Sequence, residues 1–165
     1  MVSMTLTGVC TEQSITEVGA DTAASVVVTS TAPSAAELAT IQSRCSGEVV
    51  TVPVFAYGVT LSYNIIGLDG LILTPEVIGA ILSGSITLWD HPAIAELNSG
   101  YDLTGLTEIA VMSVEGGTGS VEAMTTYLSN EAPGSWNAGV TKVLQVGEKF
   151  STELDVINEM YAVEG

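Results

Sequence analysis

The fold is decided by the stretch Leu73-Thr-Pro-Glu-Val-Ile-Gly-Ala-Ile-Leu-Ser-Gly-Ser-Ile-Thr-Leu-Trp89. Its opening, Thr74-Pro75-Glu76, predicts a helix start, because Thr is a good N-cap and Pro is favoured at the first helical position. Gly84 is a typical stop signal. Between them lies an apolar stripe at helical spacing, formed by Val77, Ile78, Ile81 and Leu82. The stretch therefore predicts an amphipathic helix with one face in a core.

On both sides of this helix, segments of β-branched residues alternate with segments of helical periodicity. We expect strands at 25–30, 49–55, 108–113 and 142–146, and a further extended segment at 58–66. Helices are expected from Ser34 to Gly47, from Pro92, at 120–129 and at 152–161. Such alternation is typical of an α/β domain. Residues 1–24 carry no readable pattern.

Composition bounds the class of protein. The 165 residues are 47% apolar, which is enough for one domain with a sizeable core. Nineteen acidic residues against three basic ones give a net charge of −16, which disfavours nucleic-acid and anionic-membrane partners. No apolar run approaches the roughly 20 residues of a membrane span, and no signal peptide opens the chain. A mature secreted protein, an excised fragment and a cytosolic protein all remain open.

The chain contains two cysteines, Cys10 and Cys45, and we expect them to form a disulfide. Two buried thiols are the alternative, because free Cys packs as a small hydrophobe. No metal site is expected, since neither a His pair for zinc nor an Asp/Asn loop for calcium is present. His91 follows Asp90 and precedes Pro92, and we expect it to cap a helix rather than to act in catalysis.

The strongest candidate for a ligand-binding segment is Val114-Glu-Gly-Gly-Thr-Gly-Ser120, which follows a predicted strand and opens a predicted helix. A helix start offers unpaired N–H groups and a positive dipole end, and glycines let a ligand approach the backbone. Thr118 and Ser120 add hydroxyl donors. The segment is not a P-loop, because no Gly-Lys-Ser/Thr follows. It predicts a nest for a small oxyanion, with an ordinary strand-to-helix turn as the alternative.

Five segments together carry a family resemblance: the 73–89 stretch, Gly58-Val-Thr-Leu-Ser-Tyr-Asn64, Pro92-Ala-Ile-Ala-Glu-Leu-Asn98, the order and spacing of Val111 to Leu128, and Ser30-Thr-Ala-Pro33. In this order they resemble phosphate-binding proteins of the PstS type. The resemblance covers residues 25–161 and leaves 1–24 unassigned. It implies a single PstS-like domain over residues 1–165.

The resemblance implies an α/β, type II periplasmic-binding-protein-like fold, mainly the second lobe with part of the first. It also implies a non-enzymatic solute-binding protein of an ABC transporter, without cofactor, in an extracellular, periplasmic or cell-surface location. Its small-molecule partner is an oxyanion such as phosphate. The expected macromolecular partner is a transporter or the rest of a larger surface protein.

Carried over by position, the ligand-binding set is Thr31, Gly117, Thr118, Gly119 and Ser120. The family's arginine falls at Ser113 or Val114, the aspartate after it falls at Gly116, and the proton-accepting aspartate falls at Thr31. A guanidinium supplies strong charge-assisted bonds to an oxyanion, so its loss implies weakened or lost binding. Glu115 beside the nest is expected to repel phosphate, and the alternatives are that it occupies the site itself or favours a neutral or cationic ligand. The alternative is a structural or adhesive surface module that keeps the fold without the ligand.

Overall fold

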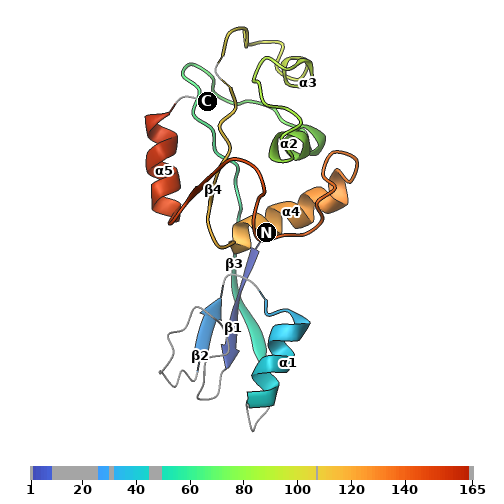
Figure 1. Cartoon of the computed structure of the whole chain (residues 1–165), viewed down its shortest axis with the longest axis vertical. Helices are drawn as coiled ribbons and strands as arrows, with labels where there is room; N and C mark the ends of the chain where they lie inside the picture. The colour runs from blue at the N-terminus through green and yellow to red at the C-terminus, as the bar shows by residue number, and fades with distance from the viewer. Residues whose placement is uncertain (1, 9–25, 30–31, 45–49, 107, 164–165) are drawn as a thin grey trace. The chain divides into compact units, whose positions relative to one another are not determined.

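The computed structural model describes residues 2–8, 26–29, 32–44, 50–106 and 108–163. They belong to two compact units, Met1–Val59 and Thr60–Gly165 (Figure 1). The expectation that residues 1–165 form one domain stays a prediction. Cys10, Cys45 and Thr31 lie outside the described residues, so the expected disulfide and the first expected ligand residue stay predictions as well.

The first unit contains a three-stranded antiparallel sheet of order β2-β1-β3 and the helix α1 (Ala35–Arg44). Its strands are β1 (Val2–Gly8), β2 (Val26–Thr29) and β3 (Thr51–Tyr57). The two expected strands and the expected helix are confirmed here to within a few residues. β1 lies in the part of the sequence that gave no reading, although Val2, Met4 and Leu6 alternate with polar residues as in a strand.

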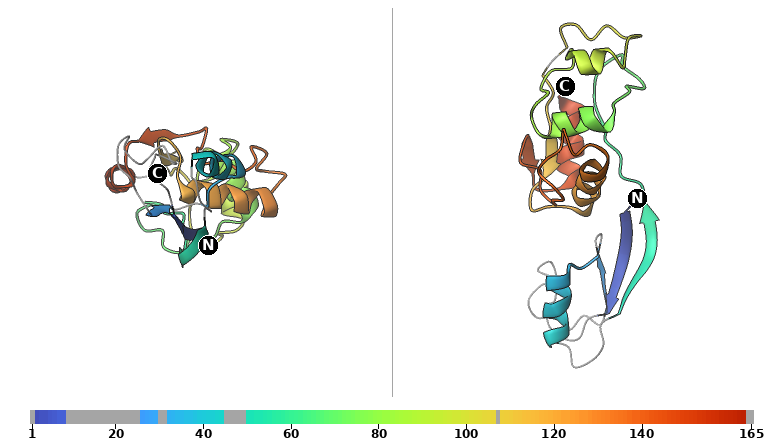
Figure 2. Two further views of the ribbon diagram at one scale, coloured as in Figure 1. Left: turned by 90° about the horizontal axis from the view of Figure 1, so that it is seen from below. Right: turned by 90° about the vertical axis from the view of Figure 1, so that its right-hand side faces the viewer.

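The described part of the second unit contains four helices and a two-stranded parallel sheet (Figure 2). They are α2 (Pro75–Leu82), α3 (Pro92–Ala95), β4 (Met112–Val114), α4 (Gly119–Glu131), β5 (Glu148–Phe150) and α5 (Glu153–Ala162). β4 pairs with β5 in the register Met112 to Glu148 and Val114 to Phe150. The helices expected at 74–84, at Pro92, at 120–129 and at 152–161 are confirmed.

The strand expected at 142–146 is wrong, and the extended segment expected at 58–66 forms no strand. Residues 142–146 form bends, because the Thr141 hydroxyl accepts from the Val143 N–H at 3.2 Å and donates to the Val143 carbonyl at 3.1 Å, which turns the chain. The strand forms later, in β5. Residues 58–65 pair with no strand among the described residues. Long-range side-chain bonds hold this segment instead, and Asn64 Nδ2 donates to the carbonyls of Met160 and Val163 at 2.8 and 2.9 Å.

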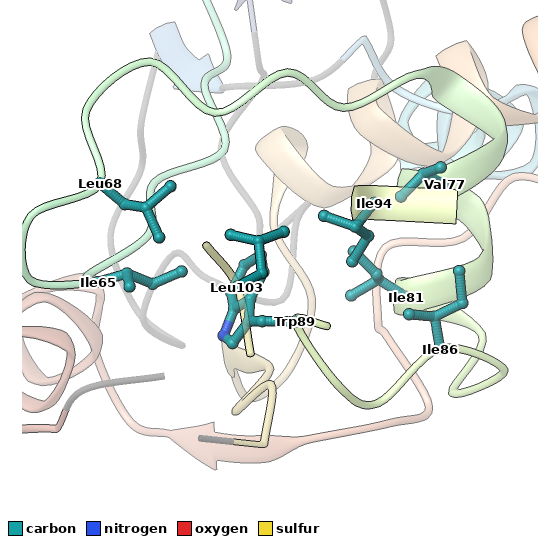
Figure 3. Packing of buried hydrophobic residues seen from close by; sticks show 8 residues of the cluster. All are labelled: Ile65, Leu68, Val77, Ile81, Ile86, Trp89, Ile94 and Leu103. Atoms are coloured by element: carbon teal, nitrogen blue, oxygen red, sulfur yellow. The ribbon is translucent and has the colours of Figure 1, made fainter. Parts of the chain in front are cut away.

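Helix α2 joins two hydrophobic clusters, which confirms its predicted apolar stripe. Figure 3 shows the first cluster, in which Val77 and Ile81 lie near the fully buried Ile94, and Trp89 lies beside Leu103. The second cluster consists of Leu82, Leu128, Trp136 and Leu144. Leu82 comes from α2 and Leu128 from α4, so this second cluster packs the two helices together. Val121, in the first turn of α4, packs against the same cluster, so the start of this helix is also tied to the core.

Candidate oxyanion-binding loop

The loop that connects β4 to α4 spans residues 115–118, and backbone hydrogen bonds hold both of its ends. The Glu115 N–H donates to the Phe150 carbonyl of β5 at 2.8 Å, and the Thr118 N–H donates to the Lys142 carbonyl at 3.1 Å. The first bond continues the sheet by one residue. The second ties the loop to the segment that follows Trp136. The loop is therefore braced by two segments that are distant in sequence.

Two consecutive glycines shape this loop. Gly116 and Gly117 have φ angles of +75° and +86°, in the left-handed region that glycine adopts most readily. A Cβ atom on Gly117 would lie 2.8 Å from the Lys142 Cβ and 3.1 Å from the Lys142 carbonyl oxygen. A Cβ atom on Gly116 would meet no atom within 4 Å. Gly117 is therefore required for close approach as well as for conformation, and Gly116 for conformation alone.

Thr118 is the N-cap of α4. Its backbone is extended, with φ −133° and ψ 157°, and its Oγ1 accepts from the Val121 N–H at 3.2 Å. The backbone N–H groups of Gly119 and Ser120, the first two of the helix, have no hydrogen-bond partner in the described part of the chain. Both belong to the four N–H groups that an α-helix leaves without internal partners. They stand at the positive end of the dipole of a 13-residue helix.

The acidic residues of the loop and the first turn work against an anion. Glu115 is exposed, and Glu122 lies half-buried one position after Val121. The Glu122 N–H donates to the Thr118 carbonyl at 3.1 Å, which is the first regular bond of the helix. The loop therefore combines neutral N–H and hydroxyl donors with nearby carboxylates, which lowers the affinity that the donors alone would give.

Ser113, one of the two positions at which the family's arginine would fall, contacts a lysine from β5. Lys149 Nζ donates to the buried Ser113 Oγ at 3.0 Å and to the Val146 carbonyl at 2.6 Å. Partial burial lowers the pKa of Lys149 below its usual range. Because β4 and β5 are parallel, Val146 lies at the opposite end of the sheet from the loop at 115–118. This ammonium group is therefore directed away from the candidate site.

Four of the five predicted ligand residues are consecutive: Gly117 and Thr118 end the loop, and Gly119 and Ser120 begin α4. The cap that His91 was expected to provide is confirmed, because its Nδ1 accepts from the Ala93 N–H at 3.2 Å at the start of α3. The residues that the structure describes contain no cluster of His, Cys, Asp and Glu that could hold a metal ion. No helix among them is long and apolar enough to span a membrane.

Sequence reasoning missed the segment at 139–143, which braces the loop through the Lys142 carbonyl. The contact joins residues that are 24 positions apart (142 − 118) and uses only a backbone carbonyl, so no local pattern marks it. The hydrogen bonds of the Thr125 hydroxyl to Thr141 in this segment follow from no local pattern either. The one available signal was that Lys142 is one of only three basic residues.

The family model for a PBP superfamily domain matches residues 2–156 of the chain. A PBP-like α/β domain and a braced strand-to-helix loop are what the structure contains. The chain therefore belongs to the PBP superfamily.

Its relatives in that superfamily include phosphate-binding proteins of mycobacteria. The chain is 32% identical to the phosphate-binding protein PstS 3 of Mycobacterium tuberculosis over 111 residues, which are 67% of this chain and 30% of that protein. It is 31% identical to PstS 3 of Mycobacterium leprae over the same length and coverage. It is 31% identical to PstS 2 of Mycobacterium tuberculosis over 104 residues, which are 63% of this chain and 28% of that protein. The matched part thus spans less than a third of these relatives, and the predicted PstS-type, partial resemblance is confirmed.

Proposed function

We propose that this chain is a non-enzymatic, solute-binding-protein-like domain that binds a small oxyanion, phosphate in the first instance, at the start of α4. The observation that carries the proposal is the pair of unpartnered N–H groups of Gly119 and Ser120 behind a glycine loop. The hydroxyl groups of Thr118 and Ser120 supply further donors at the same place. Similarity to proteins that are named phosphate-binding supports phosphate as the first ligand to test.

The proposed binding is weak. Hydrogen bonds from neutral N–H donors to a charged acceptor contribute about 1.5–3 kcal/mol each. Two such bonds correspond to roughly 3–6 kcal/mol, close to the ~4 kcal/mol of a millimolar dissociation constant. Glu115 and Glu122 oppose this gain by repulsion. We therefore expect a dissociation constant of about 1 mM or weaker at low salt.

Titration with phosphate, sulfate and molybdate at low ionic strength tests the proposal. The backbone amide resonances of Gly119 and Ser120 are expected to shift in a saturable way, with a matching calorimetric heat. The Ser120→Ala variant keeps both N–H groups and should bind more weakly but measurably. Neither heat nor amide shifts with any of the three anions would sink the proposal.

The second candidate function is a structural or adhesive surface module, and an apolar stripe on α5 favours it. Leu154, Ile157 and Tyr161 recur at helical spacing and are 65%, 46% and 76% exposed. A module that works through such a surface needs no ligand at the α4 start. Micromolar phosphate binding by the full-length protein would contradict this alternative.

Localisation outside the cytoplasm belongs to the same proposal, together with a transporter or a larger surface protein as partner. The disulfide between Cys10 and Cys45 would fit an oxidising compartment. Mass spectrometry of the alkylated protein with and without reduction tests the bond. Two alkylated thiols in protein purified without a reductant from an oxidising compartment would argue against it.

A further inference from the structure

The segment at 139–143 packs beside the loop that leads into α4, and we call this segment the wall. The Lys142 carbonyl accepts from the Thr118 N–H at 3.1 Å. The Lys142 Cβ lies so close to Gly117 that a Cβ on that glycine would be only 2.8 Å away. The Lys142 side chain therefore leaves the backbone directly against the loop.

Thr125 holds this wall in place from within α4. Its side chain is fully buried, with 0% of its surface exposed. Its Oγ1 accepts from the Thr141 N–H at 3.0 Å and lies 2.7 Å from the Thr141 carbonyl, to which it donates. The Trp136 Nε1 donates to the Gly139 carbonyl at 2.9 Å and fixes the other side of the segment. The helix whose start forms the candidate site thus also positions the wall beside it.

The two lysines of the second unit differ in whether the protein already uses their charge. Lys149 Nζ donates to Ser113 Oγ and to the Val146 carbonyl. Among the described residues, the Lys142 ammonium group makes neither a hydrogen bond nor an ion pair. The chain has 19 acidic residues and only three basic ones. A lysine that keeps its charge available beside the candidate loop is therefore a feature that needs an explanation. An ammonium on a four-carbon stem is a mobile point charge that suits an oxyanion.

We propose that Lys142 is the cation of the oxyanion site and that the buried Thr125 is the residue that positions it. The inference rests on the proposed function and adds a positively charged side chain to the site. The ammonium group offsets one of the two nearby carboxylates, Glu115 and Glu122, and supplies a charge-assisted donor that the backbone N–H groups lack. The ammonium group of Lys142 supplies the charge. The hydrogen bonds between Thr125 and Thr141 keep the Lys142 backbone next to the loop.

The first test is phosphate titration of Lys142→Met, Lys142→Arg and Lys149→Met in the full chain, by calorimetry and by the amide shifts of Gly119 and Ser120. A charge-assisted hydrogen bond is lost in Lys142→Met, so affinity should fall at least about tenfold. Lys142→Arg should bind within about threefold of wild type, because it keeps the charge. Lys149→Met is the matched control and should bind as wild type does.

The outcomes separate this inference from the proposed function. Unchanged phosphate affinity in Lys142→Met, with binding lost in Thr118→Ala, overturns the role of Lys142 and leaves the site standing. Wild-type protein that binds no anion overturns both. Equal loss of affinity in Lys142→Met and Lys149→Met also overturns the inference, because it would reflect net charge alone.

The second test concerns position. Thr125→Val removes the hydroxyl at nearly constant shape, and it should move the amide resonances of Gly117 and Thr118 and weaken phosphate binding severalfold. Thr125→Ser keeps the hydroxyl and should restore both. The control is Thr126→Val, because the exposed Thr126 Oγ1 donates only to the Glu122 carbonyl, at 2.7 Å. Loop resonances and affinity that stay at wild-type values in a folded Thr125→Val protein would contradict the positioning role.

Discussion

Helices α4 and α5 have the same kind of N-cap but different residues in their first turns. Each follows one strand of the parallel β4–β5 pair and begins after a threonine N-cap, Thr118 or Thr152 (Figure 1). In both, the threonine Oγ1 accepts from the N–H three residues later at 3.2 Å. The difference lies at that third position, which is Val121 in α4 and Asp155 in α5.

Asp155 closes the start of α5 with the chain's own carboxylate. Its Oδ2 accepts from the Thr152 N–H at 3.1 Å and from the Thr152 hydroxyl at 2.7 Å, which completes a capping box. Val121 offers no acceptor, and α4 begins behind two glycines instead. An internal carboxylate is thus hydrogen-bonded at the start of α5, whereas none is hydrogen-bonded at the start of α4 among the described residues.

The largest effect is expected from giving α4 the residue that closes α5. Val121→Glu places a carboxylate within a few ångströms of a bound oxyanion, where like charges repel by about 4 kcal/mol, so phosphate affinity should fall more than about a hundredfold. Val121→Gln removes the same apolar contacts with the Leu82, Leu128, Trp136 and Leu144 cluster without adding charge. Phosphate titration of the two variants isolates the charge, and equal affinities would break the comparison.

The next largest effect is expected on stability, from the glycines Gly116 and Gly117 that precede α4 and have no counterpart before α5. Gly117→Ala combines a left-handed φ with a clash against Lys142, and it should lower the free energy of unfolding by about 2–3 kcal/mol and distort the loop. Gly116→Ala faces the same φ penalty in open space and should cost about 1 kcal/mol. Urea denaturation compares them. Equal costs would mean that the close approach at Gly117 is not a constraint.

The two N-caps give a smaller, paired prediction. Thr118→Ala and Thr152→Ala each remove a cap and should each lower the free energy of unfolding by about 1 kcal/mol. Only Thr118→Ala should also weaken phosphate binding. Thermal unfolding with and without phosphate separates the two effects. A loss of binding in Thr152→Ala of the same size would show that the α4 start is not special.

The smallest expected effect is on alkaline stability, and it concerns the lysine that faces away from the loop. Burial lowers the pKa of Lys149, so in the range just below the usual lysine value of about 10.4 the folded chain binds fewer protons than the unfolded chain. The penalty for burying the charge is present below the folded-state pKa and is relieved as pH rises through it. Stability relative to Lys149→Met should therefore rise with pH in that range. Denaturant unfolding at about pH 8 and about pH 10 measures this difference, and phosphate should leave it unchanged.

Local signals predicted most of the second unit. The Thr74-Pro75-Glu76 start predicts α2 because cap and proline act within one turn. The segment from Val114 to Ser120 was expected to open a helix, and the structure makes Thr118 the N-cap of α4. The strand expected at 142–146 failed because a single hydroxyl, that of Thr141, turns the backbone. The β-branched residues of that segment indicate a strand only when no such side-chain bond competes.

Long-range contacts set the limit of sequence reasoning at the site. The sequence alone indicated the loop donors at Thr118 and Ser120. It did not indicate that the segment at 139–143 packs against them. Its contacts, from Thr125 to Thr141 and from Thr118 to Lys142, join residues that are far apart in the sequence. Thr31 lies outside the described residues, and its role stays a prediction.

The central claim is that the α4 start is open to an anion and the α5 start is not. Its most direct test is a phosphate titration of the ¹⁵N-labelled chain against sodium chloride of equal ionic strength, following the first two N–H groups of each helix. The account predicts saturable shifts for Gly119 and Ser120 and none for Glu153 and Leu154. Equal shifts at both helices, or none at either, would contradict it.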